Sequence, residues 1–174
     1  MHWQPPDRPR HGRPKLPQGP DVALEQIRPA REDDIPAVAL LRWNWSTGEN
    51  GVTPVVSQSE FIHSFTEWAQ ANSTTHQCFV AEFDGHLIGM AWLALNPRVP
   101  SPTRIIRSHA DIQSVYVVPV YRNSGVGARL IEAISEAAVA LGSERITVHS
   151  SEASVNFYRR AGYITSEAVR HRRL

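Results

Sequence analysis

The sequence predicts an α/β fold in which helices flank a mixed, twisted β-sheet. Residues 112–118 are rich in β-branched side chains, which is typical of a buried core strand. A turn with two glycines follows, and apolar residues then recur at the spacing of one helical face: Leu130, Ile134, Ala137 and Leu141. Residues 145–149 have the pattern of a second strand. A strand, a helix and a strand in this order predict parallel pairing through a crossover connection.

The chain of 174 residues has the length of about one domain. Residues 1–22 contain six prolines among scattered basic side chains, a composition that cannot form a core. We therefore expect a disordered N-terminal arm over 1–22 and a single folded domain over 23–174.

Composition argues against several classes of protein. A formal net charge of +1 lacks the basic excess of a nucleic-acid-binding protein. The single cysteine, Cys78, excludes an internal disulfide and is expected in the core, and no Cys/His cluster has zinc spacing, so we expect no metal. We find neither an apolar run of membrane-spanning length nor a signal peptide, and we expect a soluble cytoplasmic protein with no membrane partner.

The turn after the core strand has the composition of an anion-binding loop. The first N–H groups of a helix lack internal partners and carry partial positive charge, so such an end binds phosphate. Gly125 and Gly127 let a phosphate group approach the backbone, and Arg122 adds a charge. The same residues also suit an ordinary strand-to-helix crossover. No Gly-Lys-Ser/Thr follows, which excludes a Walker loop.

The whole string resembles the acetyl-CoA signature of the GCN5-related N-acetyltransferase (GNAT) superfamily: Val117-x-Pro119-x-x-Arg122-x-x-Gly125-x-Gly127-Ala128. In that family the strand pairs with the pantetheine arm and offers a backbone N–H to the thioester, while loop amides hold the pyrophosphate. The resemblance implies acetyl-CoA in a cleft between splayed parallel strands, 112–118 and 145–149. It also implies these cofactor-binding residues: Val117, Val118, Arg122, Asn123, Ser124, Gly125, Val126, Gly127 and Ala128.

The N-terminal half of the domain predicts a strand at 24–28, a helix that begins after Asp33 or Asp34, and a second helix over 57–71. Ile27-Arg28-Pro29-Ala30 and the helix after it resemble the opening of a GNAT domain. The second helix has a predicted buried face of Phe61, Phe65 and Trp68.

Between these helices, residues 43–51 are predicted to form a loop. In the resembling family the two helices and their link line the acceptor site, so Trp43, Trp45 and Glu49 are candidates for substrate contact. The same aromatic side chains also suit a core position.

Residues 79–93 predict a hairpin around Asp84-Gly85, a pair suited to a type I′ turn, and resemble the second and third GNAT strands. The loop 96–109 carries Arg98, Arg104 and Arg107. It is expected to be a solvated connection; the alternative is an acceptor-side lid that prefers an anionic group.

A last helix is predicted to begin after Ser150 or Ser151 and to end at Gly162, with Phe157 facing the core and Tyr158 at the margin of that face. Phe157-Tyr158-x-x-x-Gly162-Tyr163 resembles the final GNAT motif. The resemblance implies that Tyr158 is the general acid for the departing thiolate; the alternative is a packed aromatic residue.

The base that deprotonates the amine is less defined. Asp111 is the first candidate, because it stands where histone-acetylating members of the family carry a glutamate. Glu82 and His149 are alternatives, and several family members use no strict base. Little chain follows Gly162, so the sheet is expected to close with a short segment or with a second subunit, as in a homodimer.

The resulting hypothesis is acetyl-CoA-dependent N-acetylation of a primary amine by direct attack within a ternary complex. No cysteine lies in the motif region, which argues against an acetyl-enzyme. One alternative is a non-catalytic acyl-CoA-binding or regulatory module, and another is an enzyme for a longer acyl-CoA. The acceptor amine is left open, because many amines require the same transfer chemistry.

Overall fold

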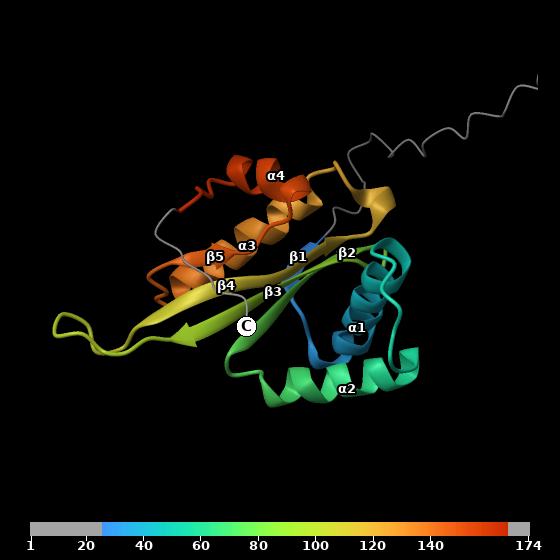
Figure 1. Ribbon diagram of the computed structural model, residues 1–174, viewed down its shortest axis with the longest axis horizontal. Helices are drawn as coiled ribbons and strands as arrows, with labels where there is room; N and C mark the ends of the chain where they lie inside the picture. Colours follow the sequence, from blue (N-terminus) through green and yellow to red (C-terminus); the bar gives the residue numbers. More distant parts are fainter. Residues whose placement is uncertain (1–25, 167–174) are drawn as a thin grey trace, which may run out of the picture.

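The protein folds into a mixed sheet of five strands with helices on both faces (Figure 1). The computed structural model describes residues 26–166. The strands are β1 (Gln26–Pro29), β2 (His76–Phe83), β3 (His86–Pro97), β4 (Ser108–Val117) and β5 (Ile146–Val148). The helices are α1 (Ile35–Asn44), α2 (Gln58–Ala71), α3 (Val126–Ala140) and α4 (Val155–Arg160). The short helical turns are η1 (Glu32–Asp34), η2 (Trp45–Glu49), η3 (Pro119–Tyr121) and η4 (Glu152–Ser154). The predicted α/β class is confirmed.

The strands lie in the sheet in their order along the chain. Neighbouring strands are antiparallel except β4 and β5, which are parallel. Helix α3 connects these two strands and lies with α4 on one face of the sheet, whereas α1 and α2 lie on the other face (Figure 1). The parallel pair predicted from the order of strand, helix and strand is confirmed.

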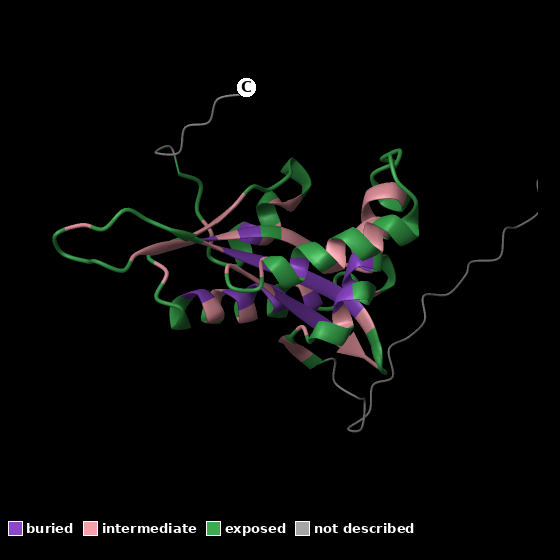
Figure 2. Cartoon of the chain, turned by 90° about the horizontal axis from the view of Figure 1, so that it is seen from below, coloured by how far each residue is buried: buried purple, intermediate pink, exposed green. Residues whose placement is uncertain are grey.

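Two apolar clusters, one on each face of the sheet, form the core. In the first cluster, Ala110 and Ile112 of β4 pack with Leu130 and Ile134 of α3. Tyr116 of the same strand belongs to the second cluster, which also contains residues of α1 and α2: Val38, Leu41 and Ala69. Figure 2 shows the buried residues concentrated along the centre of the sheet.

A β-bulge in β4 decides which of its side chains face α1 and α2. Trp92 pairs with Ser114, whereas the next residue, Leu93, pairs with Ile112, so Gln113 is the extra residue. Side chains alternate along a strand, and Ser114 therefore lies on the same face as Tyr116. The bulge thus turns a hydroxyl toward the helices that cover this face.

The β2–β3 hairpin has the predicted turn. Asp84 has φ of 49° and Gly85 has φ of 72°. Both central residues of a type I′ turn require positive φ, so the Asp-Gly prediction is confirmed. The hairpin between β3 and β4 extends beyond the rest of the sheet, at the far left of Figure 1.

Three helical details differ from the sequence predictions. Residues 43–51 are predicted as a loop, but α1 continues to Asn44 and a π-helical turn covers Trp45–Glu49. Helical spacing predicts a buried face of Phe61, Phe65 and Trp68, but within α2 only Ala69 is buried: the two phenylalanines are partly buried and Trp68 is 40% exposed, because α2 lies at the edge of the second core cluster. Leu141, at the end of the α3 stripe, is also exposed.

Part of the predicted chain lies outside the described residues. This applies to the arm 1–22, to the first residues of the strand predicted at 24–28, and to 167–174. Residues 163–166 contain no strand, so the closing strand predicted after Gly162 does not begin there.

Within residues 26–166, no helix has both the length and the apolar character needed to cross a bilayer. These residues also lack a group of three or more His, Cys, Asp or Glu side chains that could hold a metal ion. Cys78 is buried in β2, and burial raises the pKa of its thiol. This placement agrees with a core side chain rather than a nucleophile.

Gly89 of β3 occupies a position with no room for a side chain. A Cβ there would lie 3.0 Å from the Tyr116 carbonyl oxygen and 3.2 Å from Leu130 Cδ1. We expect Gly89→Ala to lower the free energy of unfolding by about 1–3 kcal/mol, measured by urea denaturation, as overpacking does. The control is Gly48→Ala, because a Cβ at Gly48 meets nothing within 4 Å. Equal stability of the two variants would contradict the close contact.

Candidate active site

Strand β4 has one edge that is only partly paired. Its pairing with β5 covers residues 110–112, whereas its pairing with β3 continues to Val117. Residues 113–117, here called the open edge, have no second strand partner within the described part of the chain. Backbone N–H and C=O groups on such an edge can pair with an extended ligand. The open edge agrees with the splayed parallel strands that the sequence predicts.

The open edge leads into the glycine loop, residues 122–127. Asn123 has φ of 62° and Gly125 has φ of 96°, a region that favours Gly and Asn. Helix α3 begins at Val126, and Arg129 donates the backbone hydrogen bond that reaches back to Gly125 O at 3.1 Å. The N–H groups before Arg129 therefore have no acceptor within the helix. This arrangement can bind an anion at the start of a helix of ordinary length.

Gly127 places the glycine loop against α4. A Cβ on Gly127 would lie 3.4 Å from the ring of Phe157 and 3.8 Å from Val117 Cγ2. These distances are ordinary contacts, so an alanine fits here. Phe157 thus connects α4, the glycine loop and the end of β4.

Arg122 is predicted to add positive charge for a phosphate, but its side chain has two partners within the protein. Its Nε donates to Val117 O at 2.8 Å, and its Nη2 donates to Glu49 Oε2 at 2.6 Å. The guanidinium also lies 5.5 Å from the centroid of the Tyr116 ring. In this arrangement Arg122 joins the end of β4 to η2.

Glu49, a predicted candidate for substrate contact, accepts hydrogen bonds from both sides. Besides Arg122, the Tyr116 hydroxyl donates to its Oε1 at 2.7 Å. Partial desolvation raises the pKa of Glu49, but the hydrogen bonds from Tyr116 and Arg122 outweigh it and the pKa is lowered. Burial, followed by the bond to Glu49, raises the pKa of Tyr116 to about 12. The sequence offers no signal for this cluster, because its members come from three separate segments.

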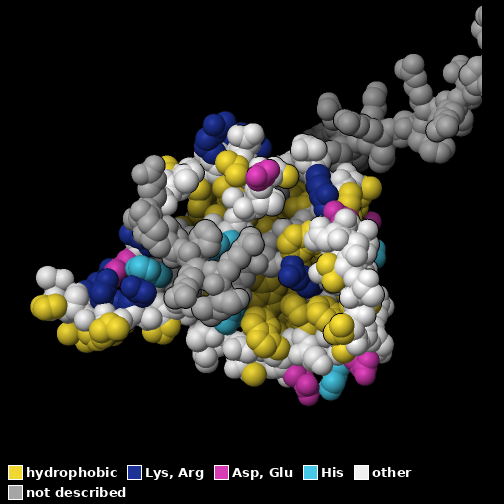
Figure 3. Space-filling view, in the orientation of Figure 1, with side chains coloured by type: hydrophobic (Ala, Val, Ile, Leu, Met, Phe, Trp, Pro, Cys, Tyr) yellow, Lys and Arg dark blue, Asp and Glu magenta, His cyan; other side chains and the backbone are white. Residues whose placement is uncertain are grey.

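Aromatic side chains surround this cluster. Trp45 stacks on Tyr116 with ring centroids 5.8 Å apart, and Trp43 packs against Phe61. The guanidinium of Arg42 lies over the Trp45 ring, a position that sequence reasoning missed. Figure 3 shows the surface hollowed between the helices of the two faces, with hydrophobic side chains and Lys or Arg atoms in the recess. Substrate contact by Trp43, Trp45 and Glu49 stays a prediction.

Tyr158 lies deeper than the sequence predicts. It belongs to the first core cluster, whereas Phe157, predicted to face inward, is only partly buried. Helix α4 has only six residues and follows the 3₁₀ turn η4, whose tighter repeat changes which side chains face the sheet. The Tyr158 ring packs against Phe157 and Tyr163, and burial raises its pKa to about 12.

The three candidate bases have different surroundings. Asp111 lies between two core residues of the first cluster and so faces α1 and α2, and its Oδ1 accepts from Thr147 Oγ1 of β5 at 2.9 Å. Glu82 pairs with Arg28 at 2.6 Å, in a network that also holds Asp34. His149 is exposed after the end of β5.

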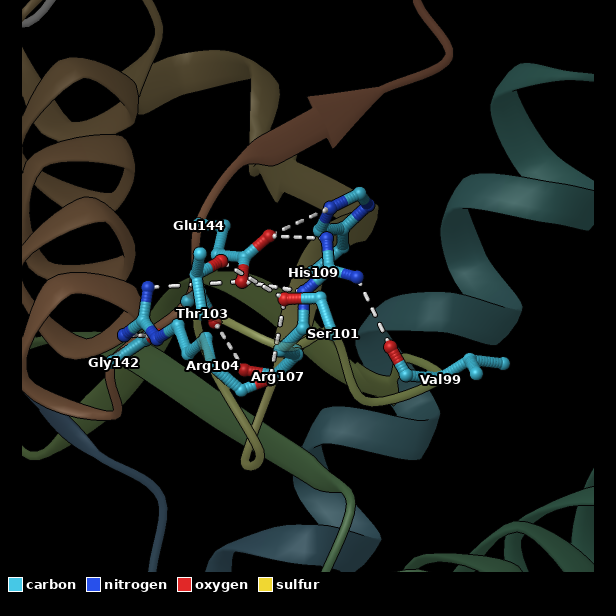
Figure 4. A network of polar contacts seen from close by, with 10 residues as sticks. Val99, Ser101, Thr103, Arg104, Arg107, His109, Gly142 and Glu144 are labelled. Carbon is cyan, nitrogen blue, oxygen red and sulfur yellow. Dashed lines mark hydrogen bonds and ion pairs between the residues drawn. The ribbon is translucent and has the colours of Figure 1, made fainter.

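Arg104 and Arg107 of the β3–β4 hairpin point toward the turn after α3 (Figure 4). Arg107 donates two hydrogen bonds to Glu144, at 2.8 and 2.9 Å, and these bonds lower the pKa of Glu144. Arg104 donates to Gly142 O at 3.2 Å. Their engagement with this turn favours a structural connection over an acceptor-side lid.

Comparisons with known proteins agree with this geometry. The model of the acetyltransferase (GNAT) family matches residues 37–163. A glucosamine 6-phosphate N-acetyltransferase of Trypanosoma brucei brucei is 34% identical over 83 residues, which are 48% of this chain and 54% of that protein. The match therefore spans about half the length of this curated relative.

Solved structures share the fold. A predicted acetyltransferase from Clostridium acetobutylicum with acetyl-CoA has a TM-score of 0.71 at 16% identity, covering 86% of this chain and 96% of that one. Glucosamine-6-phosphate N-acetyltransferase from Arabidopsis thaliana has a TM-score of 0.65 at 17% identity, covering 86% and 97%. With the family model spanning most of the described residues, the chain belongs to the GNAT acetyltransferase family.

Proposed function

We propose that the protein is an acetyl-CoA-dependent N-acetyltransferase that acts on a primary amine by direct attack in a ternary complex. The observation that carries this proposal is the open edge of β4, which runs into a glycine loop at the start of α3. An extended pantetheine can pair with the edge while a pyrophosphate meets the helix N–H groups. Acetyl-CoA supplies an acyl group activated for attack by an amine.

The residues fit such a ligand. Val117 and Val118 lie where the open edge ends, and the positive φ of Asn123 and Gly125 shapes the glycine loop. The other residues proposed to bind the cofactor are Arg122, Ser124, Val126, Gly127 and Ala128. Arg122 is proposed to contribute to the cofactor site chiefly by holding the end of β4 and η2 in place, since its side chain is bonded to Val117 and Glu49.

Tyr158 and Asp111 are the proposed acid and base. A phenol with a pKa of about 12 is protonated at neutral pH and can donate to a thiolate. Asp111 lies beside the point where β4 and β5 separate, on the face of α1 and α2. The two groups thus serve opposite faces of the sheet, which suits an amine and a thioester that approach from different sides. The trypanosomal relative makes glucosamine 6-phosphate the first acceptor to test.

Thermal denaturation with acetyl-CoA tests the cofactor site, because a ligand that binds only the native state raises its stability. We expect the melting temperature to rise with acetyl-CoA and with CoA. Gly125→Ala should need at least about tenfold more acetyl-CoA for the same rise in melting temperature. Alanine strains a residue with φ of 96° and so disturbs the loop amides.

The matched control is Gly85→Ala in the β2–β3 turn, because Gly85 also has a positive φ, of 72°, and a Cβ there also meets nothing within 4 Å. A wild-type protein without any shift at saturating acetyl-CoA would refute the transferase proposal. A shift without release of free CoA in the presence of a broad panel of amines would instead identify a non-catalytic binding module.

Removal of the Tyr158 hydroxyl tests the acid. We expect Tyr158→Phe to lower kcat by about 10²-fold or more while the affinity for acetyl-CoA is retained. Because burial raises the pKa of Tyr158 to about 12, this group should cause no fall in the rate between pH 7 and 10. Tyr163→Phe, from the same aromatic cluster, is the control. An equal rate for Tyr158→Phe and wild type would remove Tyr158 from this role.

The carboxylate of Asp111 is tested by Asp111→Asn. We expect kcat to fall by about 10²-fold, because an amide cannot take the amine proton. Asp84→Asn makes the same change in the β2–β3 turn, where asparagine tolerates positive φ, and should leave kcat unaltered. Full activity of Asp111→Asn would leave proton removal to Glu82, to His149 or to water.

A further inference from the structure

Arg42 of α1 is a half-buried arginine without an acidic partner. Its Nη1 donates to Ser114 Oγ at 3.3 Å, and its Cζ lies 4.6 Å from the centroid of the Trp45 ring. None of the ion pairs among residues 26–166 includes it. A guanidinium has five N–H donors, so this one hydrogen bond uses a small part of its capacity. Desolvation without a compensating anion lowers the pKa of Arg42.

The carboxylates of Glu49 and Asp111 are bonded to groups other than Arg42. Both oxygens of Glu49 accept hydrogen bonds, one from Tyr116 and one from Arg122. Asp111 accepts from Thr147 across the β4–β5 pair. Arg42 therefore differs from Arg122, whose charge is balanced within the protein.

Arg42 contacts β4 on the face that carries the proposed base. Ser114 follows the bulge in β4, on the open edge and on the face covered by α1 and α2. Asp111 faces the same side. The cation bonded to Ser114 and the proposed base thus lie on the same face of β4, near the place where β4 leaves β5.

We propose that Arg42 and Ser114 bind an anionic group of the acceptor, a phosphate or a carboxylate, while its amine lies toward Asp111. This inference rests on the proposed function and defines its substrate class: a primary amine that also carries an anion. A fork of N–H donors beside a hydroxyl is suited to phosphate and carboxylate oxygens. The Trp45 ring packs against the guanidinium of Arg42. This contact already restricts the Arg42 side chain, so less conformational entropy would be lost on binding.

The test compares two pairs of amines that differ in the anion: glucosamine 6-phosphate with glucosamine, and phenylalanine with phenylalaninamide. We expect wild type to prefer the anionic member of one pair by at least about tenfold in kcat/KM. A preference within the glucosamine pair would indicate that the site binds phosphate, and a preference within the phenylalanine pair would indicate that it binds carboxylate. A wild type that prefers neither anionic member would overturn the proposal.

Arg42→Met removes the charge but keeps an apolar stem over Trp45. For the preferred acceptor we expect kcat/KM to fall between about 10- and 100-fold, mainly through KM, with partial recovery in Arg42→Lys. Arg98→Met makes the same change at an exposed position of the β3–β4 hairpin and should retain the preference. An unaltered preference in Arg42→Met would also overturn the proposal.

The melting-temperature shift with acetyl-CoA, measured for each protein, separates the two proposals. If wild type shows the shift but no preference for an anionic amine, only the role of Arg42 fails. If wild type shows no shift, the transferase function fails and this inference fails with it. A shift that is lost in Arg42→Met would show that Arg42 supports the fold or the cofactor site rather than the acceptor. We expect the shift to persist in all variants.

Discussion

The candidate site depends on the point where β4 loses its parallel neighbour. Strand β5 contains only Ile146–Val148, and the chain then turns into η4 and α4. Strand β3 still holds β4 as far as Val117, so the open edge stays extended although its second side is unpaired. Had β5 continued, its backbone would satisfy the N–H and C=O groups with which we propose that a pantetheine pairs. A short strand beside a long one thus creates the open edge.

The bulge at Gln113 puts polar side chains from both halves of β4 on the same face of the sheet. Before it, alternation sends Asp111 toward α1 and α2 and its neighbours into the first core cluster. After it, Ser114 and Tyr116 face α1 and α2. The glycine loop and Tyr158 lie with α3 and α4, so the proposed sites for the acyl donor and the acceptor have separate surroundings.

Charge balance within the protein separates structural arginines from one that is available for binding. Arg28 holds Asp34 and Glu82, and Arg107 holds Glu144, so these pairs tie segments of the fold together. Arg122 fastens η2 to the end of β4 through Glu49. Arg42 lacks such a pair among the described residues, and a net charge of +1 gives no hint of this difference. Net charge is a sum over the composition, so it does not report which charged side chains form pairs in the folded protein.

The amino-acid sequence alone determined the features that depend on near neighbours along the chain. Asp84-Gly85 requires a tight turn, the stripe of α3 follows its own periodicity, and the glycine loop follows from residues that tolerate positive φ. Tertiary structure decided the rest. Arg122 meets Glu49 across 73 residues and Arg42 meets Ser114 across 72, and these meetings depend on how α1 and η2 pack over the bulged strand. Local periodicity carries no information about such contacts, because a helix presents the same spacing whichever partner it packs against.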